Sequence, residues 1–161
     1  MSGNSAVRNQ VIVNRADGGR LSAYSDAAQP GANAMTIRDP KWDTRTSDQW
    51  KLERQDDGSW LVISEKNPSV CLQPKSEAKA GVFLVLQPST GSRDQTWQLV
   101  SERTDLAATG RTGWWSLRPT TDTSLAVAPT SIGGDWSDLK LYRATDSVDR
   151  LWHHQDADES W

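Results

Sequence analysis

The sequence predicts an all-β fold made of three similar units. The segment Gln95-Thr96-Trp97-Gln98-Leu99 alternates between apolar and polar residues, as a half-buried strand does. Similar segments surround Trp50 and Trp152, 47 residues before and 55 residues after Trp97. A repeat of about 50 residues suits four short strands with their turns. The segment 93–108 lacks Gly and Pro, but its apolar residues form no helical stripe, so a strand and a loop are predicted there.

The first unit covers about residues 7–55 and is predicted to contain four strands. Their predicted positions are 10–14, 20–24, 35–37 and a strand that begins at Trp50. The tight-turn sequence Asp17-Gly18-Gly19 makes a hairpin of the first two strands. Gln29-Pro30-Gly31 breaks the chain before the third strand, and a polar loop from Asp39 to Asp48 leads to the fourth.

The second and third units, about residues 56–104 and 105–155, repeat this order. The strands predicted in the second unit are 60–63, 70–72, 81–86 and 97–99, and those in the third are 114–117, 125–127, 139–142 and 151–153. Short tails flank the units, so residues 1–161 are predicted to form a single domain. A chain of this length buries a core without help from a metal or a disulfide.

Tryptophan supplies much of the predicted core. Apolar residues make up only 35% of the chain and the mean hydropathy is −0.69, yet nine residues are Trp. Each buried indole removes on the order of 200 Å² from water, so a few Trp replace many aliphatic side chains. The single cysteine, Cys71, excludes an intrachain disulfide. Because Cys71 lies between Val70 and Leu72, it is predicted to be a buried strand residue rather than a nucleophile.

The charge pattern argues against nucleic acid and membrane partners. The net charge is −3, and 18 basic residues are scattered among 21 acidic ones, without the basic patch that a duplex or an anionic membrane attracts. No run of 18 apolar residues occurs, and residues 1–8 hold no apolar segment of signal-peptide length. We therefore expect a cytoplasmic protein, or a secreted one if a leader has been removed.

The repeats carry a resemblance to a known family. Three tandem units of about four strands, each ending in Gln-x-Trp or an altered form of it, resemble the ricin-type β-trefoil lectin domain over roughly residues 7–155. Gln95-Thr96-Trp97 is an intact copy, and Asp48 and Arg150 occupy the Gln position in the other two. The resemblance implies a β-trefoil with three pseudo-threefold repeats. It also implies that one Trp of each repeat packs in a common core, namely Trp50, Trp97 and Trp152.

The resemblance implies shallow sugar pockets, up to one in each unit. In such a pocket a carboxylate accepts paired hydrogen bonds from sugar hydroxyls, and an aromatic ring covers the apolar face of the pyranose. The family places the carboxylate directly after an apolar pair in the second strand of a unit. The corresponding residues here are Ser22, Gln73 and Ala126, none of which is an acid. A sugar site in this chain therefore has to use other residues.

Substitute residues are found in two units, and we rank the third unit first. There Tyr142 stands where the family places its stacking aromatic, and Asp149 stands where it places a polar sugar contact. Asp122 and Trp136 lie in adjoining loops and could complete that pocket. The substitutes in the second unit are Gln73 and Asp94. The competing interpretation is structural, because loop Asp residues often cap turns and surface aromatics often cover a neighbouring strand.

Catalysis has little support in the sequence. His153 and His154 are the only histidines, and neighbours on a strand point to opposite faces, so they do not jointly hold a metal. No Ser or Cys lies in a recognisable nucleophile motif and no phosphate loop occurs, so neither a cofactor nor a metal site is predicted. Paired carboxylates for glycoside hydrolysis stay open, because they need only meet in space.

Two functions remain open. The first is a non-enzymatic, lectin-like module whose partner is a glycan, weak at each site and strengthened by several sites or by a homodimer. The second is a trefoil that has lost its sugar pockets and uses its loops as a protein-interaction or protease-inhibitor scaffold. The missing acids favour the second function. Tyr142 with Asp149 and the abundant Trp favour the first, which we prefer.

Overall fold

The computed structural model describes residues 6–39, 45–102, 113–145 and 147–157, and within these ranges the protein is all-β. Its strands are β1 (Ala6–Asn14), β2 (Arg20–Ala23), β3 (Ala34–Ile37), β4 (Trp50–Arg54), β5 (Trp60–Ser64), β6 (Val70–Pro74), β7 (Leu84–Pro88), β8 (Trp97–Ser101), β9 (Trp115–Pro119), β10 (Leu125–Pro129), β11 (Trp136–Arg143) and β12 (Trp152–Asp156). Two short 3-10 turns, η2 (Arg93–Gln95) and η4 (Val148–Arg150), precede β8 and β12. No helix in this described part is long and apolar enough to cross a membrane.

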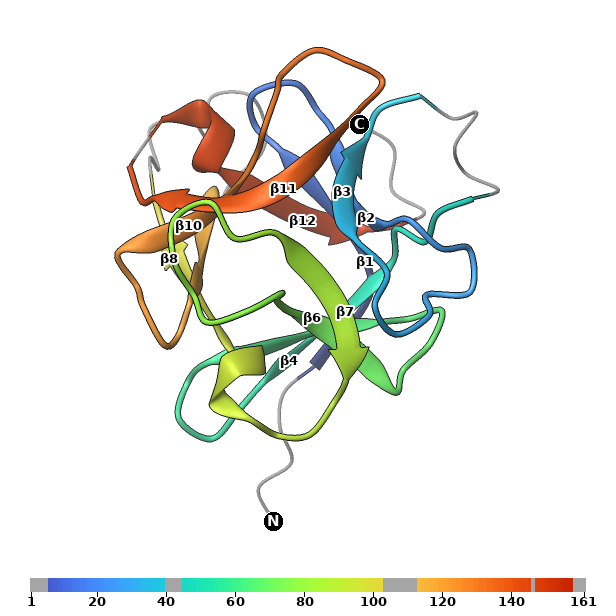
Figure 1. Ribbon diagram of the computed structural model, residues 1–161, viewed down its shortest axis with the longest axis vertical. Coiled ribbons are helices and arrows are strands. Elements are labelled where there is room, and N and C mark those ends of the chain that lie inside the picture. The colour runs from blue at the N-terminus through green and yellow to red at the C-terminus, as the bar shows by residue number, and fades with distance from the viewer. Residues whose placement is uncertain (1–5, 40–44, 103–112, 146, 158–161) are drawn as a thin grey trace.

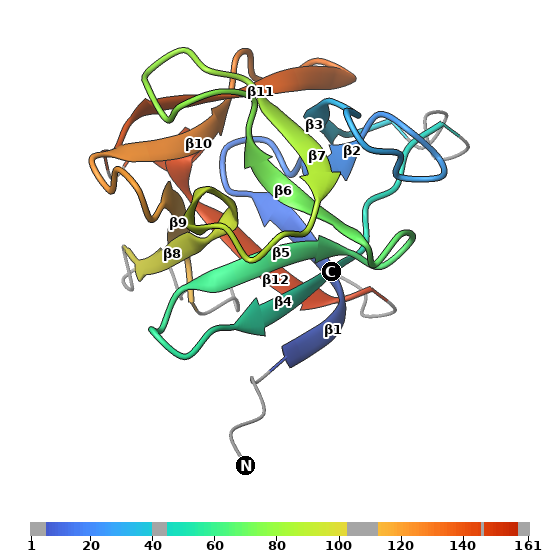
Figure 2. The ribbon, with the colours of Figure 1, turned by 60° about the horizontal axis from the view of Figure 1, so that its bottom comes forward.

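Six of the strands close into an antiparallel barrel. Around the ring, β1 pairs with β4, β4 with β5, β5 with β8, β8 with β9, β9 with β12, and β12 with β1 again (Figure 2). Closure satisfies the backbone groups that an open sheet would leave at its edges. The barrel therefore takes the first and fourth predicted strands of every unit.

The remaining strands form three hairpins, β2–β3, β6–β7 and β10–β11. The second strands of these hairpins, β3, β7 and β11, lie together on the face seen in Figure 1. The pairing of Ser137 with Thr36 joins β11 to β3, and isolated bridges join the others, Asn33 with Val85 and Phe83 with Lys140. The hairpins of different units therefore meet around one centre.

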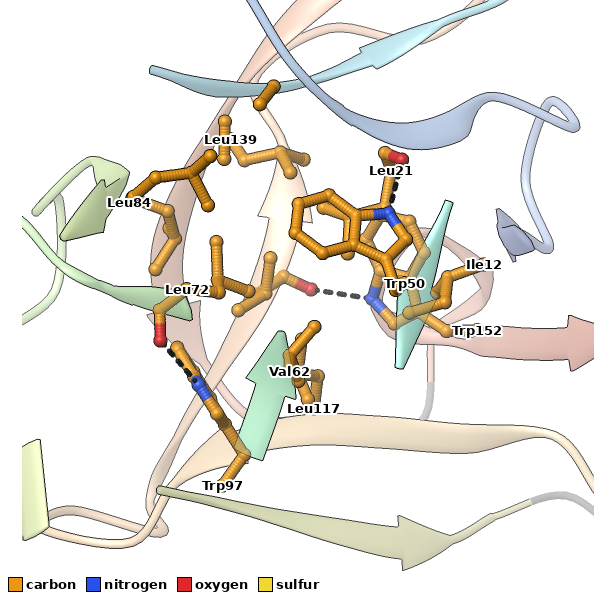
Figure 3. Close-up of a cluster of buried hydrophobic side chains, with 14 of the residues drawn as sticks. Ile12, Leu21, Trp50, Val62, Leu72, Leu84, Trp97, Leu117, Leu139 and Trp152 are labelled. Carbon is orange, nitrogen blue, oxygen red and sulfur yellow. Dashed lines mark hydrogen bonds between the residues drawn. The ribbon is translucent and has the colours of Figure 1, made fainter. Parts of the chain in front are cut away.

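The predicted Trp core is confirmed. Trp50, Trp97 and Trp152 are fully buried in one cluster of apolar side chains (Figure 3). Each indole nitrogen donates a hydrogen bond to a backbone carbonyl of the second strand in its own unit. The acceptors lie at similar distances: the Leu21 oxygen at 2.9 Å, the Leu72 oxygen at 3.1 Å and the Val127 oxygen at 3.0 Å. One packing arrangement thus occurs three times.

These hydrogen bonds correct the sequence alignment of the third unit. The indole of Trp152 bonds to Val127, so Val127 corresponds to Leu21 and Leu72. The residue after it is Ala128, and the prediction of Ala126 for the family's carboxylate position was wrong by two residues. Both residues are alanine, so the conclusion that the third unit lacks this acid is unchanged.

Other predictions differ from the structure only in detail. β7 begins at Leu84 rather than Gly81, because Gly81 lies in a turn with a φ of +91°. β11 begins earlier than predicted, at Trp136, since it pairs with β3 as well as with β10. Cys71 lies buried in β6 as predicted, and burial raises the pKa of its thiol to about 11.

Candidate functional site

The first residues to consider are those predicted in the third unit, Tyr142 on β11 and Asp149 in η4. Arg150 lies against both of them. Its guanidinium carbon is 5.2 Å from the centroid of the Tyr142 ring, and its Nη1 donates to the Asp149 carboxylate at 2.7 Å. The structure therefore brings the two predicted residues to the same place, with a cation over the aromatic ring and bound to the acid.

The charge of Asp149 reflects these contacts. Burial by itself would raise the pKa of this carboxyl group, but hydrogen bonds from Ser147 and Arg150 and the positive charge of Arg150 outweigh burial. The net effect lowers the pKa, so Asp149 is held ionised. Its oxygens already have protein donors, which a sugar hydroxyl would have to displace.

Arg150 has a structural task that explains its position. In the intact motif of the second unit, the Gln95 Nε2 donates to the Pro88 carbonyl at 2.7 Å. In the third unit, the Arg150 Nε donates to the Arg143 carbonyl, which holds the corresponding place on β11, at 3.2 Å. Arg150 thus replaces the amide of the motif and brings an additional positive charge.

Two further predicted residues do not join this group. Asp122 caps the turn before β10, where its carboxylate accepts the Ser124 amide at 3.0 Å and the Ser124 hydroxyl, and these bonds lower its pKa. Trp136 lies at the other end of β11 from Tyr142, six residues or about 20 Å away along an extended strand. The structure therefore separates Trp136 from the pocket in which it was predicted.

The second unit has fewer side chains that could contact a sugar. Gln73 is engaged with the motif, since its Oε1 accepts the Gln95 Nε2 at 2.9 Å. Asp94 is exposed on η2. The residue at the stacking position is Gln87, so this surface has no aromatic ring at the place where the family has one.

An open depression lies instead around Trp136, at the junction of β2, β3 and β11. We call it the junction pocket. It has a volume of about 280 Å³, and its lining residues are Tyr24, Asn33, Met35, Trp136 and Asp138. Tyr24 and Trp136 keep 47% and 45% of their surface exposed, so both rings are accessible to a ligand. Of the lining residues, only Trp136 was named from the sequence.

The strand register explains why these side chains meet. The amide of Tyr24 donates to the Asn33 carbonyl at 2.8 Å, which places the two residues side by side at the turn end of the first hairpin. Across the next interface, Asp138 pairs with Met35. On β11 the exposed residues alternate with buried ones, so Trp136 and Asp138 face outwards together. Two units far apart in sequence therefore build one pocket.

The loop that carries Trp136 is tied to the first unit. Its Gly133 carbonyl accepts the Arg38 Nη1 at 2.7 Å, and its Gly133 amide donates to the Asp17 carboxylate at 3.0 Å. The Arg38 Nε also donates to the Asp17 carbonyl at 3.0 Å, and the Arg38 amide donates to the Asp135 carbonyl at 2.8 Å. These bonds fix the start of β11, where Trp136 stands.

Three polar groups in the lining of the junction pocket are available to a ligand. Within the described ranges, the Trp136 indole nitrogen, the Asn33 amide and the Asp138 carboxylate make no side-chain hydrogen bond to protein. They offer donors and acceptors beside two exposed aromatic faces. A ligand with an apolar face and hydroxyl groups at its edge could use both the aromatic rings and these polar atoms. The sequence signal for one side of this pocket is the outward pair Trp136 and Asp138, two residues apart on one strand, but it does not reveal which residues lie opposite.

A larger depression on the barrel is polar, and the arginine and the glutamate in its lining already form an ion pair with each other. It has a volume of about 620 Å³ and includes Arg8 and Glu65, which are paired at 2.9 Å, while the Asn9 amide donates to the Glu65 carboxylate at 2.7 Å. His154 is engaged as well, because its Nδ1 lies 2.8 Å from the Gln10 Oε1. In the described part of the chain, no group of three His, Cys, Asp or Glu side chains could hold a metal.

Solved structures show the class of fold, which is that of the ricin-type β-trefoil lectin domain. A designed threefold-symmetric protein, ThreeFoil, matches 91% of this chain over 97% of its own, with a TM-score of 0.75 and 19% identity. The C-terminal half of the earthworm R-type lectin, solved with GalNAc, matches 91% over 96% of its own, with a TM-score of 0.60 and 10% identity.

An enzyme is also among the similar structures. An exo-β-1,3-galactanase from Clostridium thermocellum matches 96% of this chain over only 30% of its own, with a TM-score of 0.74 and 16% identity. No protein-family model and no curated protein sequence matches the chain. At these identities the likeness establishes the fold alone.

Proposed function

We propose that the chain is a β-trefoil of three pseudo-threefold repeats that acts as a non-enzymatic, lectin-like carbohydrate-binding module. The observation that carries the proposal is the junction pocket, in which exposed Trp136 and Tyr24 stand beside the unpaired carboxylate of Asp138. The likeness to a lectin solved with GalNAc supports the same function.

The chemistry of the pocket suits a pyranose. Its C–H face packs against an indole or phenol ring, and such contacts contribute on the order of 1 kcal/mol beyond the area that they bury. Asp138 accepts hydrogen bonds from neighbouring hydroxyl groups, while the Asn33 amide and the Trp136 nitrogen supply donors. Because these groups stand on paired strands, little order has to be created on binding.

A catalytic role is not part of the proposal. The thiol of Cys71 is buried with a raised pKa, which keeps it protonated, and His154 is hydrogen bonded inside the protein. The galactanase match spans 30% of that enzyme, which is consistent with a shared accessory domain. The accessible side chains of the junction pocket suit binding of a ligand rather than its chemical conversion.

The alternative is a protein-interaction scaffold on the same fold. Its support is the closed state of the family's sugar position in the third unit, where Arg150 covers Tyr142 and binds Asp149. Exposed Ile132 and Val148 add apolar surface that a protein could contact. In this alternative the loops, and not a pocket, would carry the binding energy.

A glycan array followed by calorimetric titration separates the two functions. We expect saccharide binding that Trp136→Ala weakens about tenfold or more, as truncation of an aromatic anchor does. Tyr142→Ala is the matched control, because it removes the aromatic of the position predicted from sequence and should leave the affinity unchanged. A blank array together with a captured protein partner would refute the carbohydrate function. Loss of binding in Tyr142→Ala alone would place the site beneath Arg150.

A further inference from the structure

The three hairpins can be compared position by position through their backbone hydrogen bonds. The amide of Tyr24 donates to the Asn33 carbonyl at 2.8 Å. The same bond runs from Lys75 to Phe83 at 2.8 Å in the second unit and from Thr130 to Asp138 at 2.9 Å in the third. Tyr24, Lys75 and Thr130 are therefore equivalent, and so are Asn33, Phe83 and Asp138.

A second set of bonds identifies the equivalents of Trp136. The Leu86 amide donates to the Ala32 carbonyl and the Leu141 amide to the Val82 carbonyl, both at 2.9 Å, while Ser137 pairs with Thr36 in the same relation. Ala32, Val82 and Ser137 thus correspond. The residues before them correspond as well, and these are Gly31, Gly81 and Trp136.

The aromatic pair consequently occurs at one of three equivalent junctions, all of which lie in the described part of the chain. The second junction carries Lys75 with Gly31, and the third carries Thr130 with Gly81. Gly31 and Gly81 have φ angles of +86° and +91°, a region that L side chains rarely adopt. A tryptophan at either place would strain the backbone, so the other junctions do not reproduce the pocket.

The charge of the junction pocket is also specific. Among the described lining residues, Asp138 is the only Asp, Glu, Lys, Arg or His. The next outward residue on β11 is Lys140, but its Nζ lies 4.6 Å from the centroid of the Phe83 ring and is directed to that ring. Arg38, on the other side, is bound to the Asp17 carbonyl and to Gly133. A sugar that enters the pocket meets a negative charge and no positive one among the lining residues.

We propose that the chain has a single saccharide site, the junction pocket, and that this site takes a neutral sugar and disfavours anionic ones. The inference rests on the proposed carbohydrate function and specifies its valency and ligand class. The volume of about 280 Å³ is near the lower limit of small-molecule pockets, which suits one sugar residue or the end of a short chain. A chain with one site binds a glycan without cross-linking it.

The test is isothermal titration of the wild-type protein with a neutral oligosaccharide taken from the array and with the same oligosaccharide bearing a terminal sialic acid. We expect one site per chain and an affinity for the anionic form about tenfold lower or more. Trp136→Ala should weaken binding about tenfold, and Trp136→Phe should retain part of it. Asp138→Asn should narrow the difference between the two ligands, because it removes the charge and keeps hydrogen-bonding atoms.

Tyr142→Ala is again the matched control. It removes an aromatic ring of β11 that is absent from the lining of the junction pocket, so its loss should leave affinity and stoichiometry unchanged. Two or three sites per chain, equal affinity for the two ligands, or insensitivity to Trp136→Ala would overturn the inference while leaving the carbohydrate function intact. A protein that binds no saccharide of the array would instead overturn the proposed function, and with it this inference.

Discussion

Single side chains decide which polar atoms on the surface of this protein are available to a ligand. Arg150 takes the place of a glutamine and, in doing so, binds Asp149 and covers Tyr142. Trp136 and Asp138 have no comparable neighbour in the described part of the chain. At the scale of single side chains, Arg150 closes one surface, and the junction pocket is left as the better candidate for binding.

A substitution at Arg150 tests this structural role. Arg150→Gln keeps a donor for the Arg143 carbonyl, as Gln95 does for Pro88, and loses only the cation beside Asp149, so it should lower the free energy of unfolding by less than about 1 kcal/mol. Arg150→Ala loses the donor as well as the cation, and it should cost about 1–2 kcal/mol. Urea unfolding monitored by Trp fluorescence measures both values. Equal losses in the two variants would contradict the role given to this hydrogen bond.

At the scale of elements, the loop between β10 and β11 owes its position to residues of the first unit. Arg38→Ala removes the side-chain bonds from Arg38 to the Asp17 and Gly133 carbonyls, and with them part of the support for Trp136. We expect faster hydrogen exchange in residues 131–135 and saccharide affinity about fivefold lower, which corresponds to roughly 1 kcal/mol of lost preorganisation. Both changes should appear without loss of the cooperative unfolding transition.

Arg8→Ala is the control for this loop prediction. Arg8 is an exposed arginine paired with Glu65 in the barrel depression and is absent from the lining of the junction pocket. Its loss should alter neither the exchange of the loop nor the affinity. An unchanged exchange rate in Arg38→Ala would show that the remaining bonds, from the Arg38 amide to Asp135 and from the Gly133 amide to Asp17, are enough to hold the loop.

The elements show how far the sequence determines the fold and the site. Alternating strands and a Trp repeated in each unit were enough to predict twelve strands, because burial is a local and periodic signal, and the family resemblance added that the three Trp share one core. The junction pocket could not be predicted in the same way. Tyr24 and Trp136 come from different units, and their meeting depends on the register of β3 against β11, which no local pattern encodes.

At the scale of the whole molecule, the three units share the same core and hairpin contacts but differ in their surface side chains. The backbone bonds that define the hairpins recur in all three units, and so do the bonds made by the buried indoles. Side chains outside these bonds can differ among the three units, since the core already fixes the backbone that carries them. One junction can therefore acquire a binding pocket without any change to the scaffold of the other two.

The similar environments of the three core Trp residues lead to a prediction about stability. Each of Trp50, Trp97 and Trp152 is fully buried and bonds to a carbonyl that has been withdrawn from water. Replacing any one of them by Phe removes the donor and part of the packed volume, and it should cost roughly 2–3 kcal/mol. Because the surroundings are alike, the three losses measured by urea unfolding should agree within about 1 kcal/mol.

Trp60→Phe, at a half-buried strand position beside the same core, should cost less than any of them. If one core variant were nearly as stable as wild type while another failed to fold, the three units would not contribute equally, and the threefold description would apply to the backbone alone.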